Sequence, residues 1–563
     1  MSNRMSRERY TAVYGPTAGD RVRLADTDLW VEVDADDTEP GQEVLGGCGK
    51  TARDGLLVAP RAGRDSALDM VILGVLLLDP ELGVRKTNIG IADGRIVGVG
   101  RAGNPDMADG VELVVDSHTA MITGDGLIAT PGVVDSHVHL SSPEVVPAAL
   151  SAGVTSLVGM GIGGVWDVGA NPARNLHTLI EGWRDVPINV AFLARGSTSS
   201  TELLDRAVLA GAGGFKIHED WGATPRIVDT CLAVAEQVDL PVALHTDTLN
   251  ESGFLADTLA ATAGRTVHAY HVEGGGGPPD LLEVITHPHV LTSSTTPTLP
   301  LTPATVAELF PMTMTVHKGH SMVDSDVEIA RTRVREHGIA AENELHDTGA
   351  ISIVNSDSMG MGRIAETARR TWQLAHVRAS LAGETGLEHP NNERVLRYLS
   401  KITLNPAIAH GMAHEVGSVS PGKLADIVLW HPAWFGAQPE LVIKSGFVAW
   451  GASGSGSGST RLTQPRVMRP FFGGLGSAPR RLSSVFVSAE CLADAEACAA
   501  LPAGPRYVAV RGSRGLSRAD MRRNTATPRV EVPLEPGPIV VDGREIPIHH
   551  AATLPLTRQH HLA

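Results

Sequence analysis

Side chains that bind metal ions or transfer protons recur where short apolar runs of this chain end. His137 and His139 are separated by one residue at the end of the run IATPGVVDSHVH. In a β-strand, residues i and i+2 point to the same face, so both imidazoles can reach one ion. Later runs supply further candidates, which are Lys216, His218, Glu219, Asp220, His245, His271 and Asp357. If these run ends meet in space, four histidines, Lys216 and Asp357 outline a dinuclear metal site.

Lys216 needs a physical explanation in such a site. Two divalent cations would repel an ammonium group, which offers hydrogen-bond donors but no acceptor. A deprotonated lysine amine can instead capture carbon dioxide as a carbamate, which turns a cation into an anion able to bridge two metals. The mixed nitrogen and oxygen donors suit first-row divalent ions, but they do not distinguish nickel from zinc.

Each of these residues also has a structural explanation. An HxH pair on a strand is more often structural than metal-binding, and a lysine in an apolar strand usually extends its ammonium to solvent. Asp357 can cap the next helix, and His271 can be a core histidine. The joint order of His-x-His, Lys, His, His and Asp along successive runs favours the metal site.

The elements that must position these side chains are short apolar runs that alternate with amphipathic stretches. We count eight runs, which are IATPGVVDSHVH, GVTSLVGM, INVAFLA, GFKIHED, PVALHTD, TVHAYHVEG, HVLTSST and AISIVNSD. Stretches such as TELLDRAVLAGA and PRIVDTCLAVAEQV lie between most of them. The pattern predicts the α/β class and a (β/α)8 TIM-type barrel, whose C-terminal strand ends share one mouth. A doubly wound open sheet is the alternative.

The sequence on both sides of the barrel predicts a discontinuous β-rich domain. We expect its N-terminal part over 1–127 and the metal-dependent barrel over 128–410, with an active-site flap around 310–335. Return strands over 411–450 would complete the β-rich domain. Residues 451–563 would form a flexible Gly/Ser loop and a C-terminal extension that contacts partners.

Composition restricts the class of protein. The 563 residues include 47 basic and 63 acidic side chains, a net charge of −16, which argues against binding to nucleic acid or an anionic membrane surface. The four cysteines include no CxxC pair, and the N-terminus MSNRMSRERY has no apolar segment typical of a signal peptide. We therefore expect a cytoplasmic enzyme.

Longer motifs around the candidate ligands resemble the alpha (large, catalytic) subunits of urease, within the amidohydrolase superfamily. The motifs are YGPTAGDRVRLADTDLWVEV, KIHEDWGATP, HTDTLNESGF, NPAIAHG and GSVSPGKLADIVLW, and the match covers nearly the whole chain. The resemblance implies hydrolysis of urea by water, to ammonia and carbamate, at two nickel ions bridged by N6-carboxylysine at Lys216. It also implies beta and gamma subunits in a trimer of heterotrimers, and accessory proteins that insert nickel. One ion would bind Lys216, His245 and His271, and the other would bind Lys216, His137, His139 and Asp357.

The resemblance assigns roles to two further histidines. His218 would donate a hydrogen bond to the substrate oxygen. His317, in the stretch MTMTVHKGHSMVDSDVEIARTRVR, would protonate the departing amine from a flap over the barrel mouth, with His320 as the competing candidate. Asp220 and Arg333 match the polar partners of the flap histidine, although they could instead form an ordinary surface ion pair.

Residues that would surround the substrate depart from the family pattern. Val316 stands where a cysteine usually precedes the flap histidine, and Val165 and Trp166 stand where a small residue would shape the pocket. Met359 and Gly360 replace Gln-Ala. These changes leave two alternatives, an amidohydrolase for another small or cyclic amide and a non-catalytic urease-like paralogue. The complete ligand set argues against the second.

Overall fold

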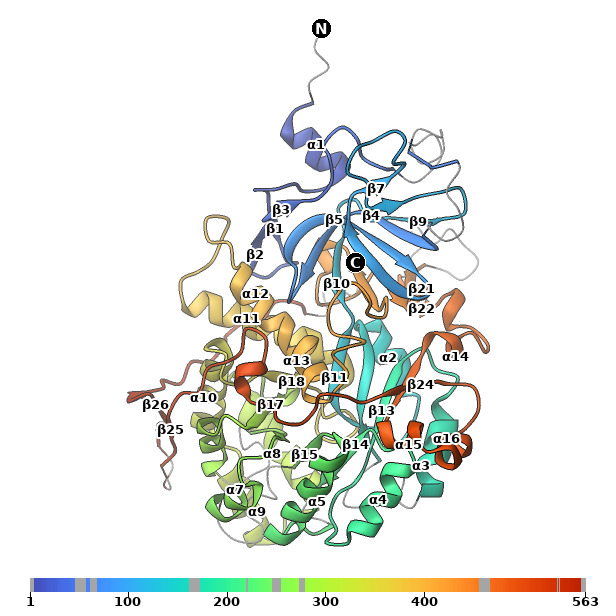
Figure 1. The fold of residues 1–563 in the computed structure, drawn as a ribbon. Helices are drawn as coiled ribbons and strands as arrows, with labels where there is room; N and C mark the ends of the chain where they lie inside the picture. The colour runs from blue at the N-terminus through green and yellow to red at the C-terminus, as the bar shows by residue number, and fades with distance from the viewer. Residues whose placement is uncertain are drawn as a thin grey trace.

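A computed structural model describes residues 5–45, 57–60, 68–161, 173–218, 221–245, 255–272, 279–454, 466–533, 535 and 537–557. It contains a β-rich domain and a barrel of strands and helices, drawn in the upper and lower halves of Figure 1. The predicted fold class, a TIM-type barrel with a discontinuous β-rich domain, is confirmed. Across the described ranges, no helix combines the length and apolar character that crossing a membrane requires.

Parallel strands form the barrel in their order along the chain. The eight strands are β11 (Val133–His139), β12 (Val154–Met160), β13 (Asn189–Arg195), β14 (Gly214–Ile217), β15 (Val242–Leu244), β16 (Val267–Ala269), β17 (Val290–Thr295) and β18 (Ile353–Asn355). A parallel bridge between Val138 and Ser358 brings the last strand back to the first. All eight predicted runs therefore contribute strands, and the run IATPGVVDSHVH divides between β10 (Ile128–Pro131) of the other domain and β11.

The connecting helices follow from their local sequence. Helix α5 (Pro225–Val238) begins where the Thr224 side chain accepts the N–H of Ile227, and it ends at Asp239 in a left-handed conformation with φ 49°. Its buried residues include positions spaced as one helical face, namely Val228, Cys231, Leu232 and Ala235. The other helices around the barrel are α2 (Val145–Ser151), α3 (Ala173–Trp183), α4 (Thr201–Leu209), α7 (Leu255–Thr262), α8 (Thr305–Val316), α9 (Asp324–Arg333), α10 (Glu336–Asp347), α11 (Thr367–Leu381), α12 (Asn392–Ile402) and α13 (Leu404–Ala409).

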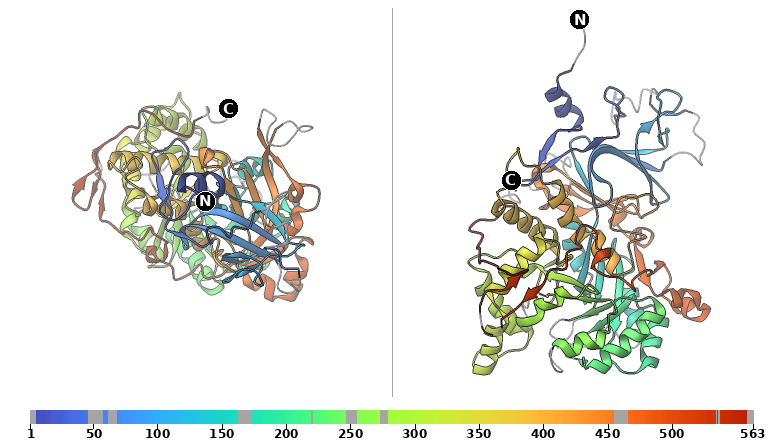
Figure 2. Two further views of the ribbon diagram at one scale, coloured as in Figure 1. Left: turned by 90° about the horizontal axis from the view of Figure 1, so that it is seen from above. Right: turned by 60° about the vertical axis from the view of Figure 1, so that its left-hand side comes forward.

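The β-rich domain is built from segments that precede and follow the barrel. Strand β10 pairs in parallel with β4 (Met70–Asp79) and antiparallel with β19 (Ile427–Trp430), so both parts of the chain share one sheet. The other strands of this sheet are β3 (Ala35–Asp36), β5 (Gly83–Ala92), β6 (Arg95–Gly100), β9 (Ala120–Thr123), β20 (Leu441–Lys444), β21 (Phe447–Ser453) and β22 (Val467–Pro470). Helix α1 (Arg7–Tyr14) stands at the far end of this domain in the views of Figures 1 and 2.

A buried ion pair joins the β-rich domain to the N-terminal ends of barrel strands. The Lys444 ammonium contacts the Asp426 carboxylate, and it also donates to the Thr155 carbonyl oxygen at 3.0 Å. The Asn189 amide donates to the same carboxylate at 2.7 Å. Because Thr155 and Asn189 lie at the starts of β12 and β13, the β-rich domain covers the barrel end opposite the mouth.

The described part of the segment after Arg461 packs on the chain itself. Strand β23 (Ser484–Val487) pairs in parallel with β13, and β24 (Arg506–Ala509) pairs with β23. The fully buried Arg518 donates to backbone carbonyls, including those of Ala350 and Val290. Most of the Gly/Ser-rich loop lies outside the described residues.

Candidate metal centre

The predicted ligands lie at the C-terminal ends of their strands. His137 is the third-last and His139 the last residue of β11, and Lys216 is on β14. His245 directly follows β15, while His271 and Asp357 each come two residues after β16 and β18. Parallel strands of a barrel end at one mouth, which is where the side chains that carry chemistry gather.

His137, His139 and Asp357 converge on one point. The Asp357 Oδ1 atom lies 3.4 Å from His137 Nε2 and 3.2 Å from His139 Nε2, and one ligand atom of each residue lies within 4.8 Å of the others. Two ligands that are each about 2.0–2.1 Å from one ion are about 3 Å apart, so this spacing fits a shared cation. The donor set of two imidazoles and one carboxylate suits a first-row divalent ion.

A second pair of histidines adjoins this cluster. His271 Nε2 lies 3.0 Å from His245 Nδ1, and the ring centres of His137 and His271 are 5.6 Å apart. The ring of His218 lies 4.0 Å from that of His245, measured between ring centres. The structure therefore brings the four predicted histidine ligands and His218 into one continuous group.

The electrostatics of the cluster favour metal-binding protonation states. Burial lowers the pKa of His137 well below its ordinary value, and the neighbouring Lys216 and His271 lower it further. Burial acts to raise the pKa of Asp357, but the hydrogen bond with His139 and the surrounding imidazoles outweigh it, so the pKa falls below its ordinary value. A neutral imidazole beside an ionised carboxylate is the state in which both can ligate a cation.

Two of the predicted ligands have uncommon backbone conformations. His271 has φ 35° and Asp357 has φ 52°, both in the left-handed region that few non-glycine residues adopt. The turn after Asp357 is held by the N–H groups of Gly360 and Gly362, which donate to the Asp357 carbonyl oxygen at 3.1 and 2.9 Å. Such conformations persist only where the surrounding structure imposes them, and they are concentrated at functional sites.

A small cavity lies beside the cluster. Its lining includes His137, His139, Lys216, His218 and Trp221. His218 is half-buried, and its backbone N–H donates to Ser197 Oγ at 3.2 Å. His218 thus lines the cavity that a ligand at the barrel mouth would enter.

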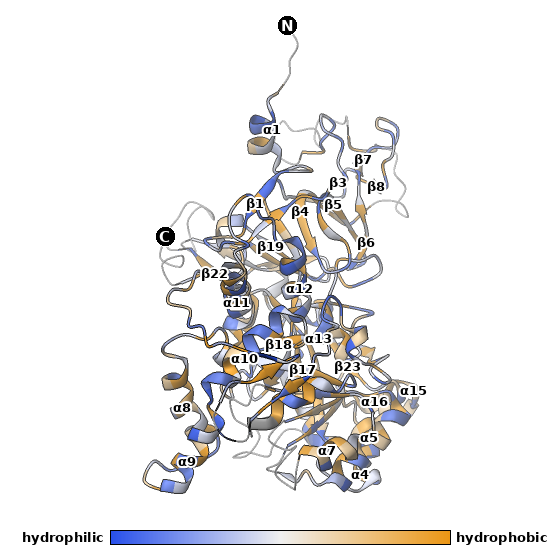
Figure 3. Cartoon of the chain, turned by 90° about the vertical axis from the view of Figure 1, so that its left-hand side faces the viewer, coloured by the Kyte–Doolittle hydropathy of each residue, from blue (hydrophilic) through white to orange (hydrophobic). Residues whose placement is uncertain are grey.

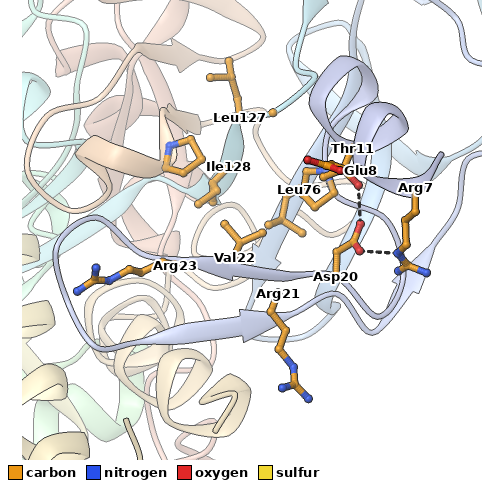
Figure 4. Close-up of a pocket in the computed structure, with 13 residues that line it drawn as sticks. Arg7, Glu8, Thr11, Asp20, Arg21, Val22, Arg23, Leu76, Leu127 and Ile128 are labelled. Atoms are coloured by element: carbon orange, nitrogen blue, oxygen red, sulfur yellow. Dashed lines mark hydrogen bonds and ion pairs between the residues drawn. The ribbon is translucent and has the colours of Figure 1, made fainter. Parts of the chain in front are cut away.

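Another cavity, of about 570 Å³, lies away from the barrel mouth. It is lined by α1, the strand β1 (Arg21–Arg23) and residues around β10, as Figure 4 shows. Arg7 and Arg21 on its wall already pair with carboxylates of this chain, Asp20 and Glu32. We therefore place the candidate functional site at the histidine cluster.

Known proteins resemble this chain along nearly its whole length. Residues 3–122 match the N-terminal domain of the urease alpha subunit, and residues 128–460 match the amidohydrolase family. Urease subunit alpha 1 of Streptomyces avermitilis is 46% identical over 557 residues, which cover 98% of this chain and 99% of that protein. Urease subunit alpha of Sulfurisphaera tokodaii is 45% identical over 562 residues, 99% of each chain.

The chain belongs to the urease alpha-subunit family. Among solved structures, dihydropyrimidinase from Brevibacillus agri covers 68% of this chain and 94% of its own, with a TM-score of 0.50 and 14% identity. That similarity concerns the fold alone. The family and the His137–His139–Asp357 cluster together indicate a metal centre.

The predicted flap histidine of this urease-family chain lies at the end of a helix. His317 follows α8, and its Nδ1 lies 3.0 Å from the Thr313 carbonyl oxygen. Arg333 is the last residue of α9, and Figure 3 shows α8 and α9 at one side of the barrel. The role of His317 in catalysis stays a prediction.

Several predicted positions fall outside the described residues or beside the cluster. Asp220, Val165 and Trp166 lie outside the residues that the structure describes. Met359 is partly exposed, and its sulfur accepts a hydrogen bond from Ser141 Oγ at 3.2 Å. Val316, at the end of α8, is also exposed.

The structure adds Asp135 to the residues predicted from the sequence. Its carboxylate accepts hydrogen bonds from the N–H groups of His137 at 3.3 Å and Ser356 at 3.1 Å, and from Thr367 Oγ1 at 2.8 Å. Burial raises the pKa of Asp135 to about 6. Asp135 thereby ties the strand that carries His137 to the turn that carries Asp357. An acidic residue inside the apolar run IATPGVVDSHVH was the signal for it.

Proposed function

We propose that this chain is the catalytic subunit of a urease, which hydrolyses urea to ammonia and carbamate at two nickel ions. The observation that carries the proposal is the near full-length identity of 46% to a urease alpha subunit, together with the convergence of His137, His139 and Asp357 at the barrel mouth. When bound, a pair of divalent ions polarises a carbonyl oxygen and activates water at neutral pH.

The ligands are proposed from the order in which the strands present them. Lys216, as N6-carboxylysine, would bridge the ions, and His245 and His271 would complete one site. His137, His139 and Asp357 would complete the other, which agrees with the short distances within each group.

The remaining residues would act on the substrate. His218 lines the cavity at the mouth and would donate a hydrogen bond to the urea oxygen, where negative charge develops. His317 would deliver a proton to the departing nitrogen, because an amide anion is too poor a leaving group to depart without one. Asp220 and Arg333 would bias the protonation state of His317.

The proposal includes an assembly. We infer beta and gamma subunits supplied by separate chains, a trimer of heterotrimers, and accessory proteins that insert nickel in the cytoplasm. A second candidate function is hydrolysis of another small or cyclic amide, which the departures from the family pattern at Val316 and Met359 motivate.

The decisive experiment measures metal content and ammonia release from urea for the purified complex, with Lys216→Ala as the variant. We expect two nickel ions per chain and urea turnover in the wild type, and loss of both in Lys216→Ala. The same nickel-loaded protein is then assayed on hydantoin. Turnover of hydantoin without turnover of urea would replace urease activity by the second candidate, and bound metal without any turnover would indicate the non-catalytic paralogue.

A further inference from the structure

Tyr270 is a buried tyrosine beside the metal centre that no motif assigned to a role. It precedes His271, only 1% of it is exposed, and its hydroxyl donates to the Ser136 carbonyl oxygen at 2.7 Å. Ser136 in turn precedes His137. The phenol thus anchors the loop after β16 to the strand that carries the His-x-His pair.

Both faces of the Tyr270 ring are covered by predicted metal ligands. The His137 ring is stacked on it with the ring centres 3.8 Å apart and the planes 20° apart. Lys216 Nζ lies 3.7 Å from the same ring centre. Two groups this close to one ring centre would overlap on a single face, so the ring lies between the imidazole and the lysine nitrogen.

These contacts determine orientation as well as burial. A lysine side chain is long and flexible, and packing its end against a flat ring restricts the directions it can take, whether Nζ is a free amine or carries the carboxyl group. Stacking at this distance fixes the plane of the His137 imidazole. Tyr270 is itself held at its edge, because the His268 ring meets it at 89° with the ring centres 4.8 Å apart.

We propose that Tyr270 is a positioning residue of the metal centre, which sets the direction of Lys216 and the plane of His137 so that both can reach the ions. The inference rests on the proposed function, since it concerns the ligands named there. Groups that orient metal ligands from outside the ligand set typically change metal affinity by 10- to 100-fold when they are removed.

If Tyr270 only filled space in the core, replacing another large buried tyrosine would reduce nickel retention to the same extent. The chain offers a matched control for this comparison. Tyr398, on α12, is fully buried, its hydroxyl donates to Asp347 Oδ1 at 3.3 Å, and Lys401 Nζ lies 5.5 Å from its ring centre. Tyr398 therefore has a comparable environment in which none of the predicted ligands takes part.

The test compares nickel retention in wild type, Tyr270→Leu, Tyr270→Phe and Tyr398→Leu, using the assembled protein loaded with nickel and titrated with a chelator. Unfolding midpoints are measured on the same samples. We expect Tyr270→Leu to bind nickel about 10- to 100-fold more weakly, and Tyr270→Phe to stay within about threefold of wild type because it keeps both ring faces. Tyr398→Leu should lower the unfolding midpoint and leave nickel affinity unchanged.

A further variant keeps the proposal testable if Tyr270→Leu does not fold. Tyr270→Met fills a similar volume with a flexible chain that offers no flat face to Lys216 or His137, so nickel affinity should fall relative to Tyr270→Phe. Equal affinity for these two proteins, or equal nickel loss in Tyr270→Leu and Tyr398→Leu, would overturn the proposal. A wild type that retains no nickel would instead refute the proposed function.

Discussion

Gly360 offers the most direct test of the geometry at the barrel mouth. A Cβ atom added to Gly360 would lie 2.4 Å from Asp357 Oδ1 and 2.9 Å from His139 Nε2. Real Cβ atoms do not come closer than 3.0 Å to such atoms, so the carboxylate must move by at least 0.6 Å relative to the backbone of residue 360. Functional side chains need to be held within about 0.5 Å of their working positions, and a displacement of about 1 Å can reduce a rate 100-fold.

The family pattern has alanine at this position, after glutamine, so the test uses a branched side chain in place of a single Cβ. We therefore expect Gly360→Val to reduce nickel affinity and kcat/KM for urea by roughly 10- to 100-fold, equivalent to about 1.4–2.7 kcal/mol. Chelator competition and steady-state ammonia release measure the two quantities. Gly182→Val is the control, because an added Cβ in α3 meets nothing within 4 Å and valine is a better helix former than glycine. Wild-type nickel affinity and kcat/KM in Gly360→Val would refute the placement of Asp357 and His139 against this turn.

Three other predictions concern separate parts of the chain. Burial raises the pKa of Glu342 from 4.5 to about 8, so the folded protein holds a proton there that the unfolded chain releases, and stability falls as pH rises between those values. Glu342→Gln still accepts a hydrogen bond from Thr298. In denaturant titrations, its free energy of unfolding should exceed that of the wild type by an amount on the order of 4 kcal/mol at pH 8 and by little at pH 4. Asp426→Ala leaves the Lys444 ammonium buried without its carboxylate and should lower the free energy of unfolding by about 3–5 kcal/mol, whereas a change below about 1 kcal/mol would show that the pair does not stabilise the domain junction. His317→Ala should retain bound nickel and lose most urea turnover, and full turnover in this variant would move the proton-donor role to His320 or to another group.

The barrel could be predicted because its signal is local. Each strand is a short apolar run, and the alternation with amphipathic helices identifies a parallel sheet without knowledge of any distant contact. The division of IATPGVVDSHVH between β10 and β11 was not predictable in the same way, because both strands are apolar and are separated by a single residue, Gly132.

The candidate site could be predicted where side-chain type alone indicates chemistry. His137, His139 and Asp357 combine donor chemistry with positions at strand ends, and the structure brings them together. Asp135, Tyr270 and Gly360 act through contacts with residues distant in the chain, such as Asp135 with Thr367. Nothing in their local sequence specifies those partners, so only the folded arrangement reveals them.

The contacts that stabilise the domain junction and the predicted metal ligands lie at opposite ends of this barrel, so mutations at the two ends should change different properties of the protein. The Lys444–Asp426 pair and the Asn189 amide fix the N-terminal ends of β12 and β13 to the β-rich domain with matched charges and satisfied hydrogen bonds. At the mouth, His271 and Asp357 are held in left-handed conformations, which are unfavourable unless neighbouring contacts impose them. Asp426→Ala should therefore lower the unfolding free energy while the nickel affinity of the folded protein stays unchanged. Gly360→Val should lower the nickel affinity while the unfolding free energy of the metal-free protein stays unchanged. A single variant at either end that changed both quantities in proportion would show that the barrel transmits strain along its strands and that its two ends are not independent.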